Sequence, residues 1–181
     1  MKKIIIGILA IGIIALGVLI FVNTGKDQVD DKGSTNTQKN ENINGEEKEV
    51  HIKLTYMGAD ITPGKTFKEK SIAAKANKST LPSCAFEGDD NVYTYDNIEI
   101  TTNASSSTET IYSVYFIDET AETNEGIKIG STKEDMIKAY GTDFNDDVSL
   151  VTYIDEDGKK QINFELDGNT ITGIEYILVL N

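Results

Sequence analysis

A run of nineteen uncharged residues near the start of the chain constrains its structure most. Ile4–Val22 reads IIIGILAIGIIALGVLIFV, contains nothing more polar than glycine, and follows Lys2 and Lys3. A helix needs roughly 20 apolar residues to cross the hydrocarbon core of a bilayer, so we expect a transmembrane helix here. The positive-inside rule keeps the two lysines in the cytoplasm. The sequence therefore predicts a single-pass protein of the cell membrane, with its N-terminus cytoplasmic and its C-terminal domain extracellular.

The alternative for this run is a cleaved secretory signal. Such signals have an apolar region of about 7–15 residues and end in a small-residue cleavage site. The run here is longer and ends in Phe21-Val22-Asn23-Thr24, without such a site. We therefore prefer an uncleaved anchor, residues 1–22, and keep a secreted soluble protein as an alternative.

The next segment, residues 23–49, is polar and rich in Asn, Lys, Asp and Glu. Only Val29 and Ile43 are large and apolar, so the segment cannot bury enough surface to offset its chain entropy. We expect a disordered tether here. Residues 50–181 are then one domain's worth of chain.

The charge of the chain limits its possible partners, and its cysteine content limits how the fold can be stabilised. The net charge is −13 and every basic residue is a lysine, so a nucleic acid is an improbable partner. One cysteine allows no internal disulfide, and stability must come from the core.

Residue patterns predict both strands and helices in residues 50–181. Alternation indicates a half-buried strand at Val50–Met57, and apolar spacing indicates a helix at Thr66–Asn77. A second helix should begin after Ser131 or Thr132, each followed three residues later by an acid, and end at Gly141. The remaining expected strands are Val92–Thr102 (a hairpin turning at Asp96-Asn97), Thr110–Asp118, Ser149–Ile154, Gln161–Leu166 and Thr170–Leu180.

The order of these elements suggests an internal duplication. Ile61-Thr62-Pro63-Gly64 and Ile127-Lys128-Ile129-Gly130 each precede a predicted helix, a hairpin and a last strand. We expect an α+β fold of tandem helix-plus-antiparallel-hairpin repeats, with units at about 58–120 and 126–181. One α+β domain without a repeat remains the alternative.

The stretches PSCAFEGDDNVYTYDNIEI and EGIKIGSTKEDMIKAYG resemble a pattern in membrane-anchored surface proteins of Gram-positive bacteria. The double layout is similar to the β-lactamase-inhibitor-protein fold and to BamE-type outer-membrane assembly lipoproteins. Those folds are binding scaffolds, so the resemblance implies a binding role. No site residue of those families can be matched here.

Three residue groups suggest chemistry but fit structural roles better. Cys84 and His51 are residue types that can act as a thiol nucleophile and its base. Their order behind an N-terminal anchor resembles sortase transpeptidases, but those enzymes also need an arginine, and this chain has none. Asp143, Asn145 and Asp147 begin like a calcium loop, but Val148 and Ile154 occupy positions that need Gly and Glu. Gly130–Thr132 precedes a helix whose first turn is acidic, which favours capping over anion binding. We expect no enzyme, no cofactor and no metal site.

Charge is uneven along the chain. Residues 65–78 hold five lysines and one acid, a balance of 5 − 1 = +4, whereas residues 87–175 hold 21 acids and five lysines, a balance of −16. An anionic partner could contact the lysines of the first segment, which are Lys65, Lys68, Lys70, Lys75 and Lys78. The sequence thus predicts an extracytoplasmic binding module for an unknown envelope protein or wall polymer. An envelope assembly or structural factor is the alternative.

Overall fold

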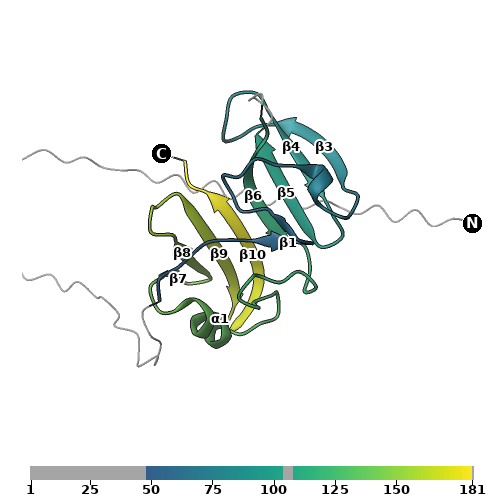
Figure 1. Ribbon diagram of the computed structural model, residues 1–181. Helices are drawn as coiled ribbons and strands as arrows, with labels where there is room; N and C mark the ends of the chain where they lie inside the picture. The colour runs from purple at the N-terminus through teal and green to yellow at the C-terminus, as the bar shows by residue number, and fades with distance from the viewer. Residues whose placement is uncertain (1–47, 104–107, 181) are drawn as a thin grey trace, which may run out of the picture. The chain divides into compact units, whose positions relative to one another are not determined.

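The computed structural model describes residues 48–103 and 108–180, which form a mostly β structure (Figure 1). Strands β3 to β10 form one antiparallel eight-stranded sheet, and β1 and β2 form a small hairpin. The bounds are β1 Thr55–Tyr56, β2 Ala59–Asp60, β3 Asn77–Pro82, β4 Asp89–Thr94, β5 Ile98–Asn103, β6 Thr110–Phe116, β7 Asn145–Asp147, β8 Leu150–Ile154, β9 Lys160–Asp167 and β10 Thr170–Leu178. One α-helix, α1, spans Lys133–Tyr140, and one 3₁₀ turn, η1, spans Glu69–Ser71.

The sheet is built from two blocks of four consecutive strands. Its strand order is β3-β4-β5-β6-β10-β9-β8-β7, so the last strand of each block lies at the centre and pairs with the other. Strands β6 and β10 join the blocks through the pairs Tyr115–Glu175, Val114–Tyr176 and Ser113–Ile177. The join therefore brings together residues about 60 positions apart in the sequence.

The two blocks repeat the same backbone contacts. Gly64 and Gly130 both have positive φ angles, 86° and 91°, and each donates its N–H to the strand that ends its block. The acceptors are the carbonyl oxygens of Ile111 and Ile171, both at 2.8 Å. Glycine adopts positive φ without a steric penalty, which explains its presence at both turns.

Two further features recur at matching places. Thr66 bridges Thr110 in the first block, and Thr132 bridges Thr170 in the second. Each block also has a β-bulge in the pairing of its last two strands. The strand order and these contacts are those of two equivalent half-sheets. The unit boundaries 58–120 and 126–181 remain a prediction.

The predicted helix at Thr66–Asn77 is wrong. The segment forms only η1, and the N–H of Phe67 donates to the carbonyl oxygen of Glu109, next to the bridge that Thr66 makes. Lysines crowd what would be the first turn, where negative charge is favoured. The Ser71 hydroxyl also donates to the Lys68 carbonyl oxygen and competes for a backbone group that a helix would use.

The predicted fold class is therefore also wrong. The tandem helix-plus-hairpin arrangement, similar to β-lactamase-inhibitor protein, needs a helix in each half, but in the described part of the chain α1 is the only α-helix. The described residues are mostly β, in one eight-stranded sheet. None of the helices among residues 48–103 and 108–180 has the length and apolar character to cross a bilayer. The expected anchor at 1–22 and nearly all of the expected tether lie outside the described residues.

The second helix prediction is confirmed. Thr132 is the N-cap of α1, and its hydroxyl oxygen accepts from the N–H of Asp135, whose carboxylate accepts from the N–H of Thr132. Gly141 follows the helix with a φ of 89°. Met136, Ile137 and Tyr140 are its buried residues. Reciprocal capping and a positive-φ glycine fix both ends.

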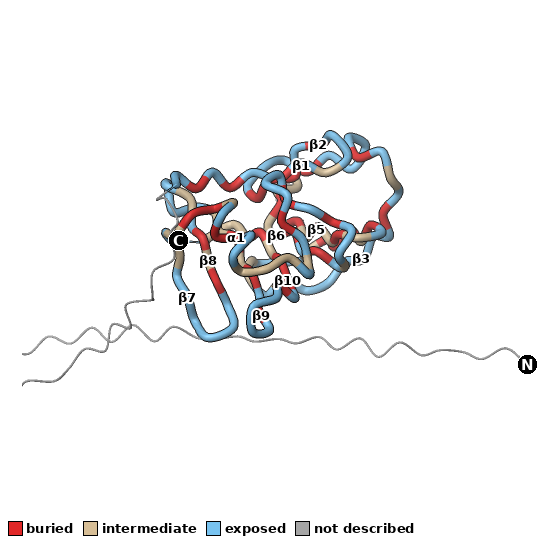
Figure 2. Tube along the Cα trace, turned by 90° about the horizontal axis from the view of Figure 1, so that it is seen from below, coloured by how far each residue is buried: buried red, intermediate tan, exposed pale blue. Residues whose placement is uncertain are grey.

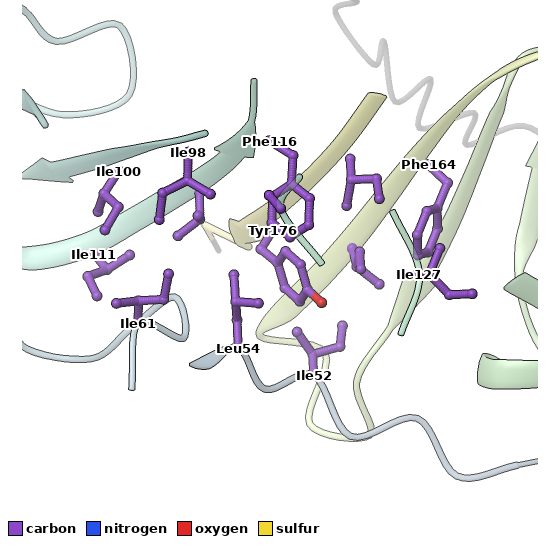
Figure 3. Close-up of a cluster of buried hydrophobic side chains, with 14 of the residues drawn as sticks. Ile52, Leu54, Ile61, Ile98, Ile100, Ile111, Phe116, Ile127, Phe164 and Tyr176 are labelled. Atoms are coloured by element: carbon purple, nitrogen blue, oxygen red, sulfur yellow. The ribbon is translucent and has the colours of Figure 1, made fainter. Parts of the chain in front are cut away.

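The core lies between one face of the sheet and the segments that cover it. These covering segments are residues 50–54, the β1–β2 hairpin, residues 67–76 on both sides of η1, and α1 (Figure 1). Figure 2 shows β1 and β2 on one side of the sheet strands. In Figure 3, Ile52, Leu54 and Ile61 of the cover point toward Tyr176 and other sheet side chains. The predicted alternation of Val50–Met57 holds in burial, but only Thr55–Tyr56 is a strand.

Candidate functional site: the outer face of the sheet

Strand register divides the sheet side chains into two faces. One face is the core. We call the other the outer face, and one of its rows crosses six strands through the partners Thr94, Glu99, Tyr115, Glu175, Asn163 and Thr152. Side chains of directly opposite residues lie on the same side of a sheet, so this row is continuous. The core row beside it contains Tyr93, Ile100, Val114, Tyr176, Ile162 and Tyr153, all buried.

The outer face is acidic. Register and side-chain alternation place on it the carboxylates Asp90, Glu99, Asp147, Glu165, Asp167 and Glu175. The two lysines in the strands, Lys78 and Lys160, are paired with Tyr93 and Leu178 and lie on the opposite side of the sheet. Among the sheet residues described, the outer face therefore carries only negative formal charge.

Glu165 and Glu175 form the centre of this charge. Gly173 on β10 is the cross-strand partner of Glu165 on β9 and lies two residues before Glu175. A methyl group on Gly173 would approach the Glu165 carboxylate oxygen to 2.7 Å, so the carboxylate lies over this glycine. Burial and, secondarily, the negative charge of Glu165 raise the pKa of Glu175 to about 7. The Ser113 hydroxyl donates to Glu175 and opposes part of that shift. No lysine is within salt-bridge distance of either glutamate in the described chain.

Aromatic side chains border the two glutamates. Tyr115 is 40% exposed, and its pKa is raised by burial and then by Glu165, Glu175 and Glu99. Tyr112, the bulged residue of β6, meets Phe86 edge to face with ring centroids 5.2 Å apart. Burial, followed by Glu175 and Asp90, raises the pKa of Tyr112, which places its ring near both acids.

Exposed apolar side chains also lie on this face, near both edges of the sheet. Leu81 on β3, and Leu150 and Ile154 on β8, are outer-face residues that are 36% to 52% exposed. Ile117 follows the core residue Phe116 and is 43% exposed. Asp90 is a further polar residue of this face, and one of its carboxylate oxygens is buried without a hydrogen-bond partner in the described structure. Apolar surface mixed with polar groups that lack partners is typical of an interaction surface.

The predicted lysine cluster lies elsewhere. Lys65, Lys68, Lys70 and Lys75 are exposed in the segment that leads to β3, on the covering side of the molecule. Lys78, on β3, lies 4.9 Å from the centre of the Tyr93 ring and 3.5 Å from Glu109. Contact of these lysines with an anionic partner stays a prediction.

The structure places the other candidate residues in ordinary roles. Cys84 is exposed in the β3–β4 loop, and His51 is on the cover, 3.6 Å from Glu49. Asn145 and Asp147 belong to β7 and pair with Thr152 and Leu150.

The backbone amides of Gly130, Ser131 and Thr132 are already used, by Ile171, Lys128 and Asp135. An anion would have to displace these acceptors. The helix start therefore serves capping, as the acidic first turn suggested.

The outer face was not predicted from the sequence. The alternation in Ile98-Glu99-Ile100 and in Ile174-Glu175-Tyr176 carried a signal, since it assigns each glutamate to the side opposite the core. The pairing of β6 with β10, which puts Tyr115 beside Glu175, had no sequence signal. In comparisons with known proteins, no family model, curated protein or solved structure matches this chain.

Proposed function

We propose that this chain is a membrane-anchored, extracytoplasmic, non-enzymatic binding module, and that it takes its partner on the outer face of the sheet. One observation carries the proposal. A continuous face of an eight-stranded sheet combines exposed aromatic and aliphatic side chains with carboxylates that have no lysine partner. An uncovered antiparallel sheet normally faces water with alternating polar residues. Here apolar groups interrupt that pattern.

The location outside the membrane rests on the sequence. The apolar run Ile4–Val22 supports an anchor, and the lysines before it support a cytoplasmic N-terminus. The polar residues 23–49 would then hold the sheet away from the membrane surface. A binding module on such a tether can meet either a protein or a wall polymer of the envelope.

The edge of the sheet supports a second candidate, an envelope assembly or structural factor. Among the described strands, β3 pairs only with β4, and all six of its residues are exposed. An exposed edge strand presents unpaired backbone groups to which another chain can add a strand. Pro82, at the end of β3, restricts such pairing to the part of the strand before it.

Photo-crosslinking in intact cells tests the main proposal. A photoreactive amino acid replaces Tyr115 on the outer face of the full-length chain, and matched variants place it at Met57 on the covering hairpin and at Ser79 on β3. We expect a discrete adduct from position 115 and none from position 57. An adduct from position 79 alone would favour the assembly factor.

Protease shaving of the same cells tests the topology. Residues 50–181 should be digested from outside, and full protection of this domain would contradict the extracytoplasmic location. Equal adducts from positions 115 and 57 would contradict a partner specific to the outer face.

A further inference from the structure

We propose that the outer face docks an extended polypeptide segment that carries lysine or arginine side chains, with Glu165 and Glu175 as the charge partners and Tyr112 and Tyr115 as flanking aromatic contacts. This inference rests on the proposed function, because it names the chemistry of the partner for the same surface. It makes docking of the basic segment dependent on the protonation of Glu175.

Charge complementarity is the first argument. The outer face has six carboxylates and no lysine at its sheet positions, while the lysine-rich segment of the chain lies on the covering side. Lysines of the described chain form ion pairs with acids such as Glu109, Asp146 and Asp155, but with none of the outer-face carboxylates. A partner with positive side chains would find complementary charge across several strands, which favours both encounter and register.

The surroundings of Glu175 provide the second argument. Strand β6 presents the Ser113 hydroxyl, Tyr115 and Tyr112 to it, and β9 presents Glu165 and Asn163. In the described part of the chain, its carboxylate accepts one side-chain hydrogen bond, from Ser113. A half-buried carboxylate beside a second carboxylate costs stability unless a cation or proton joins it. An ammonium or guanidinium group would supply the positive charge and the hydrogen-bond donors that Glu175 lacks in the described chain.

The aromatic rings favour a polypeptide over a free metal ion. Tyr115 lies between Glu99 and Glu175 in one cross-strand row, and Tyr112 is braced by Phe86. Tyrosine faces attract lysine and arginine and also pack against apolar stems. The exposed Leu150 and Ile154 extend this surface beyond the charges. In the described residues, no group of three possible ligands is arranged to hold a metal ion.

Protonation of Glu175 sets the pH dependence. Its pKa of about 7 means that the carboxyl group is mostly neutral at pH 6 and mostly ionised at pH 8. A cation that needs the ionised form therefore binds about tenfold more tightly at pH 8 than at pH 6. Docking at pH 7 should also release about half a proton per chain, because Glu175 is half protonated there.

A peptide titration of the full-length chain in neutral detergent tests the inference. The probe is a synthetic peptide of alternating lysine and serine, and the matched probe replaces every lysine with glutamine. Isothermal titration at pH 6 and pH 8 should show binding of the lysine peptide only, about tenfold tighter at pH 8. High salt should weaken it, since the contacts are partly exposed charges.

Two variants assign the effect to the outer face. Glu175→Gln should weaken binding at pH 8 by more than tenfold and abolish the difference between pH 6 and pH 8. Glu69→Gln changes the net charge equally on the covering side and should keep both the affinity and the pH dependence. Glu165→Gln provides a second outer-face variant, which should weaken binding at both pH values. Circular dichroism of each variant confirms that it folds.

The outcomes separate this inference from the proposed function. The inference is overturned if the glutamine peptide binds equally well, if Glu175→Gln keeps the pH dependence, or if sedimentation shows that a second copy of the chain occupies the face. If a crosslink forms at position 115 but the lysine peptide does not bind, the inference fails and the binding module stands. Without the crosslink, the proposed function itself fails.

Discussion

Glu175 should make the protein less stable as the pH rises, and Glu175→Gln should remove that effect. The carboxyl group has an ordinary pKa of 4.5 and a pKa of about 7 in the folded chain, where burial and Glu165 disfavour its charge. Between these two values the folded chain holds a proton that the unfolded chain has lost. The stabilising effect of this proton is complete below about pH 4.5 and is lost as the pH rises through 7.

The magnitude follows from the shift. With 1.36 kcal/mol per pKa unit, raising the pH from 5 to 8 should lower the free energy of unfolding by about 2 to 3 kcal/mol through this group alone. Glutamine keeps the shape of the side chain and carries no charge. The free energy of unfolding of Glu175→Gln, relative to that of the wild-type chain, should therefore rise by about 2 to 3 kcal/mol between pH 5 and pH 8.

Urea denaturation of the full-length chain in neutral detergent, followed by tyrosine fluorescence at several pH values, measures the difference. The pKa of Glu156 is also raised, mainly by Glu49, but this exposed group titrates in both chains and cancels. Glu69→Gln serves as the control and should follow the wild-type curve. A constant difference between Glu175→Gln and the wild type from pH 5 to pH 8 would refute the reasoning.

Four other changes have defined outcomes. Gly130→Ala forces a side chain into a φ of 91° and should cost about 1 to 2 kcal/mol in urea denaturation, although the new methyl group meets no neighbour within 4 Å. Thr132→Ala removes the N-cap of α1 and should cost about 1 kcal/mol in the same assay, whereas Thr132→Ser should cost little. Phe164→Ala empties a fully buried core position and should cost about 3 to 5 kcal/mol, measured as a lower urea midpoint. If Lys68 and Lys70 contact an anionic partner, changing both to Gln should weaken salt-sensitive retention on anionic vesicles, and unchanged retention would exclude that contact.

Local patterns predicted the second half of the chain better than the first. The capping signal around Thr132 and the glycine at 141 are both found where the sequence placed them. Each depends on residues within a few positions, so neighbouring side chains decide the outcome. The hairpin at Asp96-Asn97 was predictable for the same reason, since Tyr95 and Ile98 close it.

The first half shows how tertiary contacts override such patterns. Thr66–Asn77 has the apolar spacing of a helix, and Phe67 and Ile72 are indeed buried. The backbone there pairs with residues 109 and 110 instead, over 40 positions away. The Phe67 ring packs on Tyr93 at 4.4 Å between centroids. No local window contains these partners.

The candidate site was hidden for a related reason. Alternation assigns single residues to a face of a strand, but the central pairing of β6 with β10 decides which of them become neighbours. The acids of residues 87–175 were visible as charge, but strand order decides which of them lie together on the outer face.

Titration of the Glu175 carboxyl group by carbon NMR, with and without the lysine–serine peptide, tests the account most directly. We expect a midpoint near pH 7 in the free full-length chain and a lower midpoint when the peptide is bound, because a docked cation favours the ionised form. A midpoint near the ordinary value of 4.5, or one that the peptide leaves unchanged, would contradict docking at the outer face.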